Sequence, residues 1–215
     1  MSSTDSTAFP DVATEAIVVM DLVESTATSN LFGWYAVGRQ LMPELRALIL
    51  AVSPPRGLRC LKSTGDGYLL TFGDRGAAEN AAVHAVDASF ELLGHIEARN
   101  RQVSEERALH LRIAIHLGEV DVVENDREGP HVSFTFRLGA ISRASLTSAL
   151  NPIAPEGLPL PNYILCSEEV VGILSRRVAQ WTALSIGLFK LKGFPGWREV
   201  FQLRRVLSQD SLTRQ

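Results

Sequence analysis

The fold of this chain is decided by the stretch Leu58-Arg-Cys-Leu-Lys-Ser-Thr-Gly-Asp-Gly-Tyr-Leu-Leu-Thr-Phe72. Two apolar runs flank a Gly-Asp-Gly sequence, a pattern typical of a β-hairpin. Gly65 and Gly67 supply the backbone freedom of a tight turn and leave no side chains beside the carboxylate of Asp66. That carboxylate either serves the turn or binds an ionic ligand, and the hairpin pattern alone fits both interpretations.

Working outward from the hairpin, the chain alternates strand-like and helix-like segments. An apolar, β-branched run over residues 16–22 predicts a buried strand that ends on an acid, Asp21. Helical periodicity or strand alternation predicts the other main segments, which are helices at 31–52, 76–100 and 131–149 and a strand at 109–118. The order βαββαβ predicts an α+β protein with a ferredoxin-like antiparallel sheet that has its helices on one face, followed by C-terminal strands.

Length and composition suit a single domain. The chain has 215 residues, 46% of them hydrophobic, and a net charge of −3, which gives no general reason to expect nucleic acid or an anionic membrane as a partner. We expect a disordered polar N-terminus over residues 1–14, one domain over 15–205 and a polar tail over 206–215. No apolar run approaches the ~20 residues of a membrane span. The N-terminus also lacks the pattern of a signal peptide, so a cytoplasmic protein is expected.

The two cysteines and the two acids lead to different expectations. Cys60 and Cys166 lie in apolar, strand-like runs and are expected to be reduced, buried thiols. A ferredoxin-like sheet places the end of the first strand beside the hairpin, which brings Asp21 close to Asp66. Two neighbouring carboxylates repel each other unless a cation lies between them. Oxygen ligands together with phosphate favour Mg²⁺ or Mn²⁺.

Four segments, taken in order, resemble the class III nucleotide cyclases. They are Val-Val-Met-Asp-Leu-Val-Glu-Ser-Thr26, Lys-Ser-Thr-Gly-Asp-Gly-Tyr68, Leu-Arg-Ile-Ala-Ile-His-Leu-Gly-Glu-Val120 and Leu-Lys-Gly-Phe194. The resemblance covers about residues 15–205. It implies a homodimer with active sites at the subunit interface. Each site would convert a nucleoside triphosphate to a 3′,5′-cyclic monophosphate plus pyrophosphate, with two divalent ions, Mn²⁺ or Mg²⁺.

The resemblance assigns a metal and triphosphate site to the end of the first strand. Asp21 and Asp66 match the two metal-binding aspartates, and Leu22 matches the residue whose backbone carbonyl joins them. The turn with Ser25 and Thr26 matches the segment that wraps the triphosphate. From the residues alone, these two hydroxyl side chains fit either a helix cap or a phosphate site.

The resemblance also assigns residues that recognise the base and the phosphates. Lys62 and Asp126 match the base-reading positions, and a lysine with an aspartate looks like adenine selection. Arg137 matches the arginine that stabilises charge at the transferring phosphate, and Lys192 matches a lysine that contacts phosphate. In the implied dimer, Lys62, Asp126 and Arg137 serve the site whose metals are held by the other subunit.

The segment before Arg137 departs from the family pattern. Ser133 stands where the family has an asparagine that orients the ribose, and it is the matching catalytic position here. Phe134 and Phe136 replace small residues, and they either narrow the base pocket or face the core. With a short chain, these departures resemble the pyrimidine cyclases of bacterial antiphage systems (Pycsar), which make cyclic UMP or cyclic CMP for a separate effector.

Three functions therefore follow from the sequence. The preferred one is a pyrimidine cyclase that makes a second messenger in antiphage defence. An adenylate cyclase is the alternative that the pairing of Lys62 with Asp126 favours. A catalytically degenerate cyclase domain that binds nucleotide or dimerises is the alternative that Ser133 favours.

Overall fold

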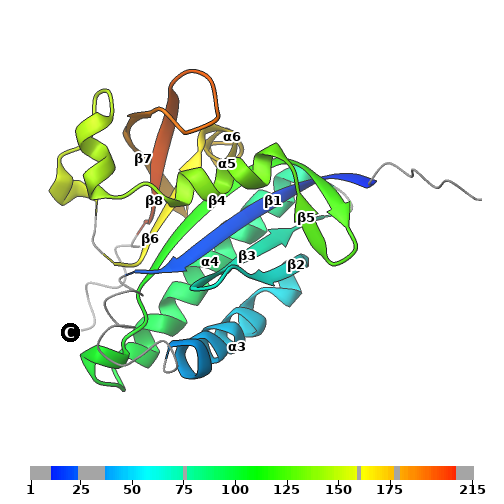
Figure 1. Cartoon of the computed structure of the whole chain (residues 1–215), viewed down its shortest axis with the longest axis vertical. Coiled ribbons are helices and arrows are strands. Elements are labelled where there is room, and N and C mark those ends of the chain that lie inside the picture. Colours follow the sequence, from blue (N-terminus) through cyan, green and yellow to red (C-terminus); the bar gives the residue numbers. More distant parts are fainter. Residues whose placement is uncertain (1–10, 24–36, 75–76, 159–160, 177–179, 207–215) are drawn as a thin grey trace, which may run out of the picture.

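The computed structural model describes residues 11–23, 37–74, 77–158, 161–176 and 180–206 (Figure 1). Its strands are β1 (Asp11–Leu22), β2 (Leu58–Ser63), β3 (Gly67–Phe72), β4 (Leu111–Val123), β5 (Asp126–Glu128), β6 (Tyr163–Ser167), β7 (Trp181–Phe189) and β8 (Arg198–Arg205). Its α-helices are α3 (Met42–Val52), α4 (Ala78–Asn100), α5 (Pro130–Gly139) and α6 (Glu168–Leu174).

One sheet organises the described residues, with strand order β2-β3-β1-β4-β6-β8-β7 and β5 paired to β4. The first four strands pair antiparallel in the order β4-β1-β3-β2, which is the ferredoxin-like arrangement. Strand β6 then joins β4 in parallel, after a crossover that contains α5. The prediction of an α+β ferredoxin-like sheet with further C-terminal strands is therefore confirmed.

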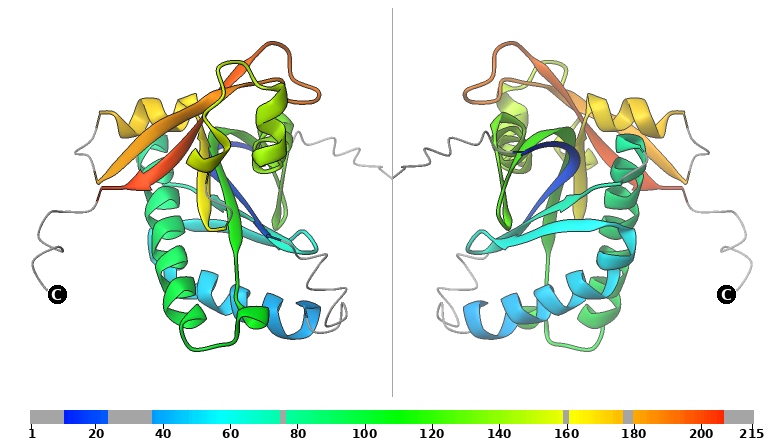
Figure 2. Two further views of the ribbon diagram at one scale, coloured as in Figure 1. Left: turned by 90° about the vertical axis from the view of Figure 1, so that its left-hand side faces the viewer. Right: turned by 90° about the vertical axis from the view of Figure 1, so that its right-hand side faces the viewer.

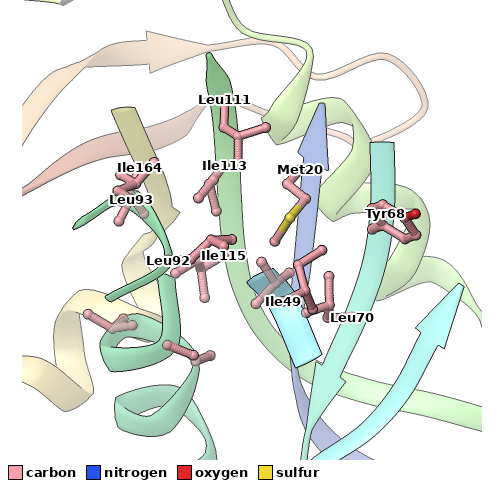
Figure 3. Packing of buried hydrophobic residues seen from close by; sticks show 14 of the residues in the cluster. Met20, Ile49, Tyr68, Leu70, Leu92, Leu93, Leu111, Ile113, Ile115 and Ile164 are labelled. Atoms are coloured by element: carbon pink, nitrogen blue, oxygen red, sulfur yellow. The ribbon is translucent and has the colours of Figure 1, made fainter. Parts of the chain in front are cut away.

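Helices cover both faces of this sheet, so the prediction of helices on one face is wrong for α5. Figure 2 shows α3 and α4 on one side and α5 on the other. On the α3/α4 face, alternate strand residues such as Met20, Leu70 and Ile113 pack with Ile49 of α3 and Leu92 of α4 in an extensive apolar cluster (Figure 3). Strand residues of the opposite parity face α5, because successive side chains of a strand alternate between faces. The α3/α4 face thus holds the largest apolar cluster, and the α5 face combines smaller apolar clusters with polar residues.

Several element boundaries differ from the predicted ones. Strand β1 begins at Asp11, so residues 11–14 belong to the sheet and the predicted disordered segment is wrong for them. Strand pairing with β4 extends to Asp11 opposite Val122, which supplies the hydrogen bonds that order this part of the chain. Helix α3 begins at Met42, and Pro43 lies in its first turn, where a proline leaves no hydrogen bond unmade.

Strand β4 is longer than predicted. The sequence predicts a strand that ends at residue 118, but β4 continues unbroken to Val123. The chain reverses after it, at Glu124, whose φ of 52° is in the left-handed region. Gly118 instead provides space, because a Cβ atom there would lie 2.3 Å from the ring of His131.

Two further expectations concern the cysteines and the membrane. Cys60 and Cys166 are both buried free thiols, as predicted. Among the described residues, no helix combines the length and the apolar character that a membrane crossing requires.

Candidate active site

The first group of site residues is a pair of carboxylates at the end of β1. Asp21 lies directly opposite Gly67 across the β1–β3 pair, and the backbone N–H of Leu22 donates a hydrogen bond to the carbonyl oxygen of Asp66 at 3.1 Å. Burial raises the pKa of Asp21, and the negative charge of Asp66 adds to that rise. The structure therefore brings together Asp21, Leu22 and Asp66 at a position where negative charge is destabilised without a cation.

The two hairpin glycines have different roles beside this pair of carboxylates. Gly65 has a φ of 108°, which favours glycine, so it forms the turn. A Cβ atom on Gly67 would lie 2.0 Å from the carbonyl oxygen of Met20 and 2.7 Å from Oδ1 of Asp21. Any other residue at position 67 would therefore displace the carboxylate of Asp21.

The donor atoms at this end of the sheet fit a hard divalent cation. Among the described residues there is no group of three or more His, Cys, Asp or Glu side chains that could hold a metal ion. Two carboxylates are nevertheless what Mg²⁺ commonly takes from a protein, since phosphate and water oxygens complete its coordination. Asp21 and Asp66 would hold such an ion, and the resemblance assigns the backbone carbonyl of Leu22 to the same site.

Sequence reasoning missed an arginine in this group. Arg112 lies directly opposite Asp21 across the β1–β4 pair, and its Nη2 atom is 3.6 Å from Oδ2 of Asp21. Its positive charge lowers the pKa of Asp21 and so partly offsets the effects of burial and of Asp66. The signal that could have found it is the strand register, which places Arg112 and Asp21 in one cross-strand pair.

The second group is the base-reading pair that the resemblance implied. Lys62 at the end of β2 donates a hydrogen bond to Oδ2 of Asp126 at the start of β5. This bond raises the pKa of Lys62 and lowers that of Asp126. Lys62 lies opposite Leu69, which lies opposite Val19, so its side chain shares the face of the sheet that carries Asp21.

The third group lines a cationic cavity beyond the end of α5. Arg137 in the last turn of that helix shares a cavity of about 410 Å³ with Lys190 and Lys192. Sequence reasoning missed Lys190, whose Nζ atom lies 4.9 Å from the centre of the Trp197 ring. Ser133 is exposed one helical turn before Arg137, on the same side of α5. The cavity therefore offers three positive charges to an anion.

The two phenylalanines of α5 have different surroundings. Phe134 is 8% exposed, with its ring centre 4.5 Å from that of His116 and 5.2 Å from that of Phe194. Phe134 therefore faces the core. Phe136 is 37% exposed and is the one of the two that can meet a ligand. Ser25 and Thr26, the predicted triphosphate residues, lie outside the described residues.

Solved structures share this architecture across almost the whole chain. An adenylate/guanylate cyclase/hydrolase from Silicibacter pomeroyi superposes with a TM-score of 0.67 at 24% identity, over 92% of this chain and 99% of the other. The adenylyl cyclase CyaB from P. aeruginosa superposes with a TM-score of 0.71 at 17% identity, over 92% of this chain and 96% of the other. This chain has the fold of a class III nucleotide cyclase domain. The predicted resemblance to these cyclases is confirmed at the level of the fold.

The cyclase fold alone does not determine which base the nucleotide substrate carries. The guanylate cyclase domain of RhGC from Catenaria anguillulae, solved with GTP, also superposes, with a TM-score of 0.67 at 13% identity over 92% of this chain and 100% of the other. No protein-family model matches the chain. The curated "Putative adenylate cyclase 3" of Rhizobium meliloti (strain 1021) is 36% identical over 84 residues. That match spans 39% of this chain and 13% of the relative's length.

Proposed function

We propose that this chain is a nucleotide cyclase, which converts a nucleoside triphosphate to a 3′,5′-cyclic monophosphate and pyrophosphate. The observation that carries the proposal is the gathering of three complementary groups on the α5 side of one cyclase fold. These are the carboxylates of Asp21 and Asp66, the pair of Lys62 with Asp126, and the cationic cavity at Arg137. They supply in turn a cation site, a base contact and an anion site.

Each group has a distinct part in the reaction. Divalent ions, when bound, lower the pKa of the ribose 3′-hydroxyl and neutralise the leaving pyrophosphate. Asp21 and Asp66 hold the ions and so place them beside the nucleotide. The 3′-oxygen attacks the α-phosphorus, and the bond from that phosphorus to the pyrophosphate oxygen breaks. Arg137 stabilises the negative charge that builds up on the phosphate, and Lys192 attracts the phosphate chain.

We propose that the complete site forms between two copies of the chain, in a homodimer related by a two-fold axis. The resemblance to the class III cyclases implies such a dimer. Arg137, Lys190 and Lys192 line one cavity, and neither Asp21 nor Asp66 is part of that lining. In a two-fold dimer the cations of one copy can meet the carboxylates of the other, because each interface element occurs twice.

For the base, the geometry favours ATP. Lys62 and Asp126 are already in contact, so one donor and one acceptor are held side by side, as the edge of adenine requires. Phe134 is buried in the core, so of the two phenylalanines only Phe136 could narrow the base pocket. UTP or CTP remains the second candidate, which the exposed Phe136 and Ser133 favour. In that case the cyclic pyrimidine nucleotide would act as an antiphage second messenger for a separate effector.

A four-nucleotide assay tests the proposal. The purified chain is incubated with ATP, GTP, CTP or UTP and Mn²⁺, and the cyclic products are separated by chromatography. We expect cyclic AMP to form fastest, with Asp66→Ala as the inactive control. A faster reaction of UTP or CTP would support the second candidate. Nucleotide binding without any cyclic product would contradict the cyclase and support a degenerate domain.

A further inference from the structure

A buried ion pair lies directly behind the base-reading aspartate. Nε of Arg127 donates to Oε2 of Glu15 at 2.7 Å, and Nη2 donates to Oε1 at 3.0 Å, so the guanidinium binds the carboxylate through two parallel hydrogen bonds. The two side chains are 8% and 6% exposed. Apolar residues of the α5 face surround this part of the sheet, among them Ile17 and Val132.

The pair joins a short strand to the centre of the sheet. Strand β5 has only three residues, and its ladder partner is β4. Glu15 belongs to β1, 112 positions away in the sequence, so its two bonds to Arg127 fix β5 across the face of the sheet. A planar guanidinium held at two points has a defined orientation, which a single contact with a lysine would not give.

The same arginine also holds Asp126. The backbone N–H of Arg127 donates to Oδ1 of Asp126 at 2.8 Å, and Nη1 of Arg127 donates to the carbonyl oxygen of Asp126 at 2.9 Å. Oδ2 of Asp126 accepts the bond from Lys62, whose side chain is half exposed. Of these contacts, only the ones made by Arg127 lead back to a buried anchor. Arg127 thus holds Asp126 in place together with the pairing of β5 with β4.

We propose that Glu15 and Arg127 are positioning residues that determine which base the site accepts, through the placement of Asp126. The inference rests on the proposed function, because it takes Asp126 as a base contact. Stability alone does not explain the pair, since a buried ion pair is commonly matched or exceeded in stability by apolar residues of similar size. A fixed bidentate geometry gives a defined position to the residue beside it.

The test replaces both charges together. In the double variant Glu15→Val with Arg127→Leu, no unpaired buried charge is left behind, so the fold is retained. We expect the ratio of kcat/KM between the preferred nucleotide and the other three to fall at least ~10-fold, a loss equal to one lost hydrogen bond. The melting temperature is expected to stay within a few degrees of the parent, because the apolar replacements fill the same space.

A matched control comes from the other side of the sheet. Arg99 binds Glu44 with the same two-bond geometry, at 3.0 and 2.7 Å, between α4 and α3. The double variant Glu44→Leu with Arg99→Leu should leave the nucleotide preference unchanged. A single Arg127→Lys change keeps the positive charge but loses the two-bond contact with Glu15. We expect it to cause an intermediate loss of nucleotide preference.

Binding of the four nucleotides, measured by calorimetry, separates this inference from the proposed function. Absence of turnover in the parent chain would contradict the cyclase, and the inference would then stand or fall on whether the double variant loses the parent's binding preference. An unchanged preference in the double variant overturns the inference. A parent chain that shows no preference in either measurement overturns it as well.

Discussion

The two faces of the central sheet are built from the same strands but are filled by different chemistry. On the α3/α4 face, strand residues such as Met20 and Ile115 meet the helices in a continuous hydrocarbon cluster (Figure 3). On the α5 face, the neighbouring residues of the same strands are in several places charged or polar; they are Glu15, Asp21, Lys62, Arg112 and His116.

The two faces contribute differently to the stability of the fold and to the placement of its charged side chains. Hydrocarbon packing stabilises the fold in proportion to the buried apolar area, and it does not depend strongly on the exact direction of each side chain. Paired charges contribute little net stability, but each pair fixes the direction of two side chains. The α3/α4 face therefore contributes the largest apolar cluster to the stability of the fold, and the α5 face combines two smaller apolar clusters with the candidate site residues. Substitutions on the two faces should affect different measurements.

The largest expected effect is on catalysis at the α5 face. Arg137→Ala should lower kcat by ~10²–10³-fold, because a fixed positive charge at the reacting phosphate is lost. Thermal unfolding should be unchanged, since the Arg137 side chain is exposed. Arg143→Ala is the control, because Nε of Arg143 bonds the carbonyl oxygen of Leu158 at 2.7 Å. It should lose about 1 kcal/mol of stability and keep its activity.

The next effect is on stability at the α3/α4 face. Ile113 is fully buried in the apolar cluster, so Ile113→Ala should lower the free energy of unfolding by about 2–5 kcal/mol. Ile113→Val should cost only about 0.5–1.5 kcal/mol, because less volume is removed. Urea denaturation measures both. A large loss of kcat in an Ile113→Ala protein that is still folded at the assay temperature would contradict the division between the faces.

A smaller effect is expected on nucleotide preference. Lys62→Ala should reduce kcat/KM for ATP by about 10-fold relative to UTP and CTP, because one hydrogen bond to the base is lost. The exposed Lys62 side chain makes no large contribution to the fold. Arg59→Ala on the same strand is the control and should leave the preference as it is. An unchanged preference in Lys62→Ala would remove Lys62 from base recognition.

The smallest effect is a pH dependence of stability at the start of α5. Burial lowers the pKa of His131, and the neighbouring His116 adds to the shift; Nδ1 of His131 is 2.8 Å from Nε2 of His116. The unfolded chain then binds more protons than the fold just below pH 6.5. The free energy of unfolding should therefore decrease as the pH falls from about 6.5 through the lowered pKa of His131.

His131→Gln is expected to flatten this part of the profile of unfolding free energy against pH. His95→Gln, on the outer side of α4, should leave the profile unchanged apart from a constant offset. The charged group near His116 on α6 is Glu169, whose carboxylate has a pKa lowered to about 2 and so stays ionised over this range. A parent profile that is flat between pH 5 and pH 7 would contradict the role of His131.

The sequence was sufficient for contacts that depend on local motifs and strand order. The Gly-Asp-Gly turn and the order βαββ place Asp21 beside Asp66, and the structure has them together. The contact between Glu15 and Arg127 could not be foreseen in this way, because it depends on how a three-residue strand folds back over β1. Asp11 is likewise ordered because it pairs with β4, and no local sequence pattern predicts this pairing.

The central claim, that the two halves of the site come from different copies, is tested most directly by mixing two inactive variants. Asp66→Ala removes a carboxylate, and Arg137→Ala removes a cation from the cavity. The two are co-expressed with different tags, so that mixed dimers can be purified and counted. Random pairing makes half of the dimers mixed, each with one intact site, so the mixture should recover about a quarter of the parent activity.

A mixture that stays as inactive as its parts, with mixed dimers present and both variants folded, would contradict a shared site.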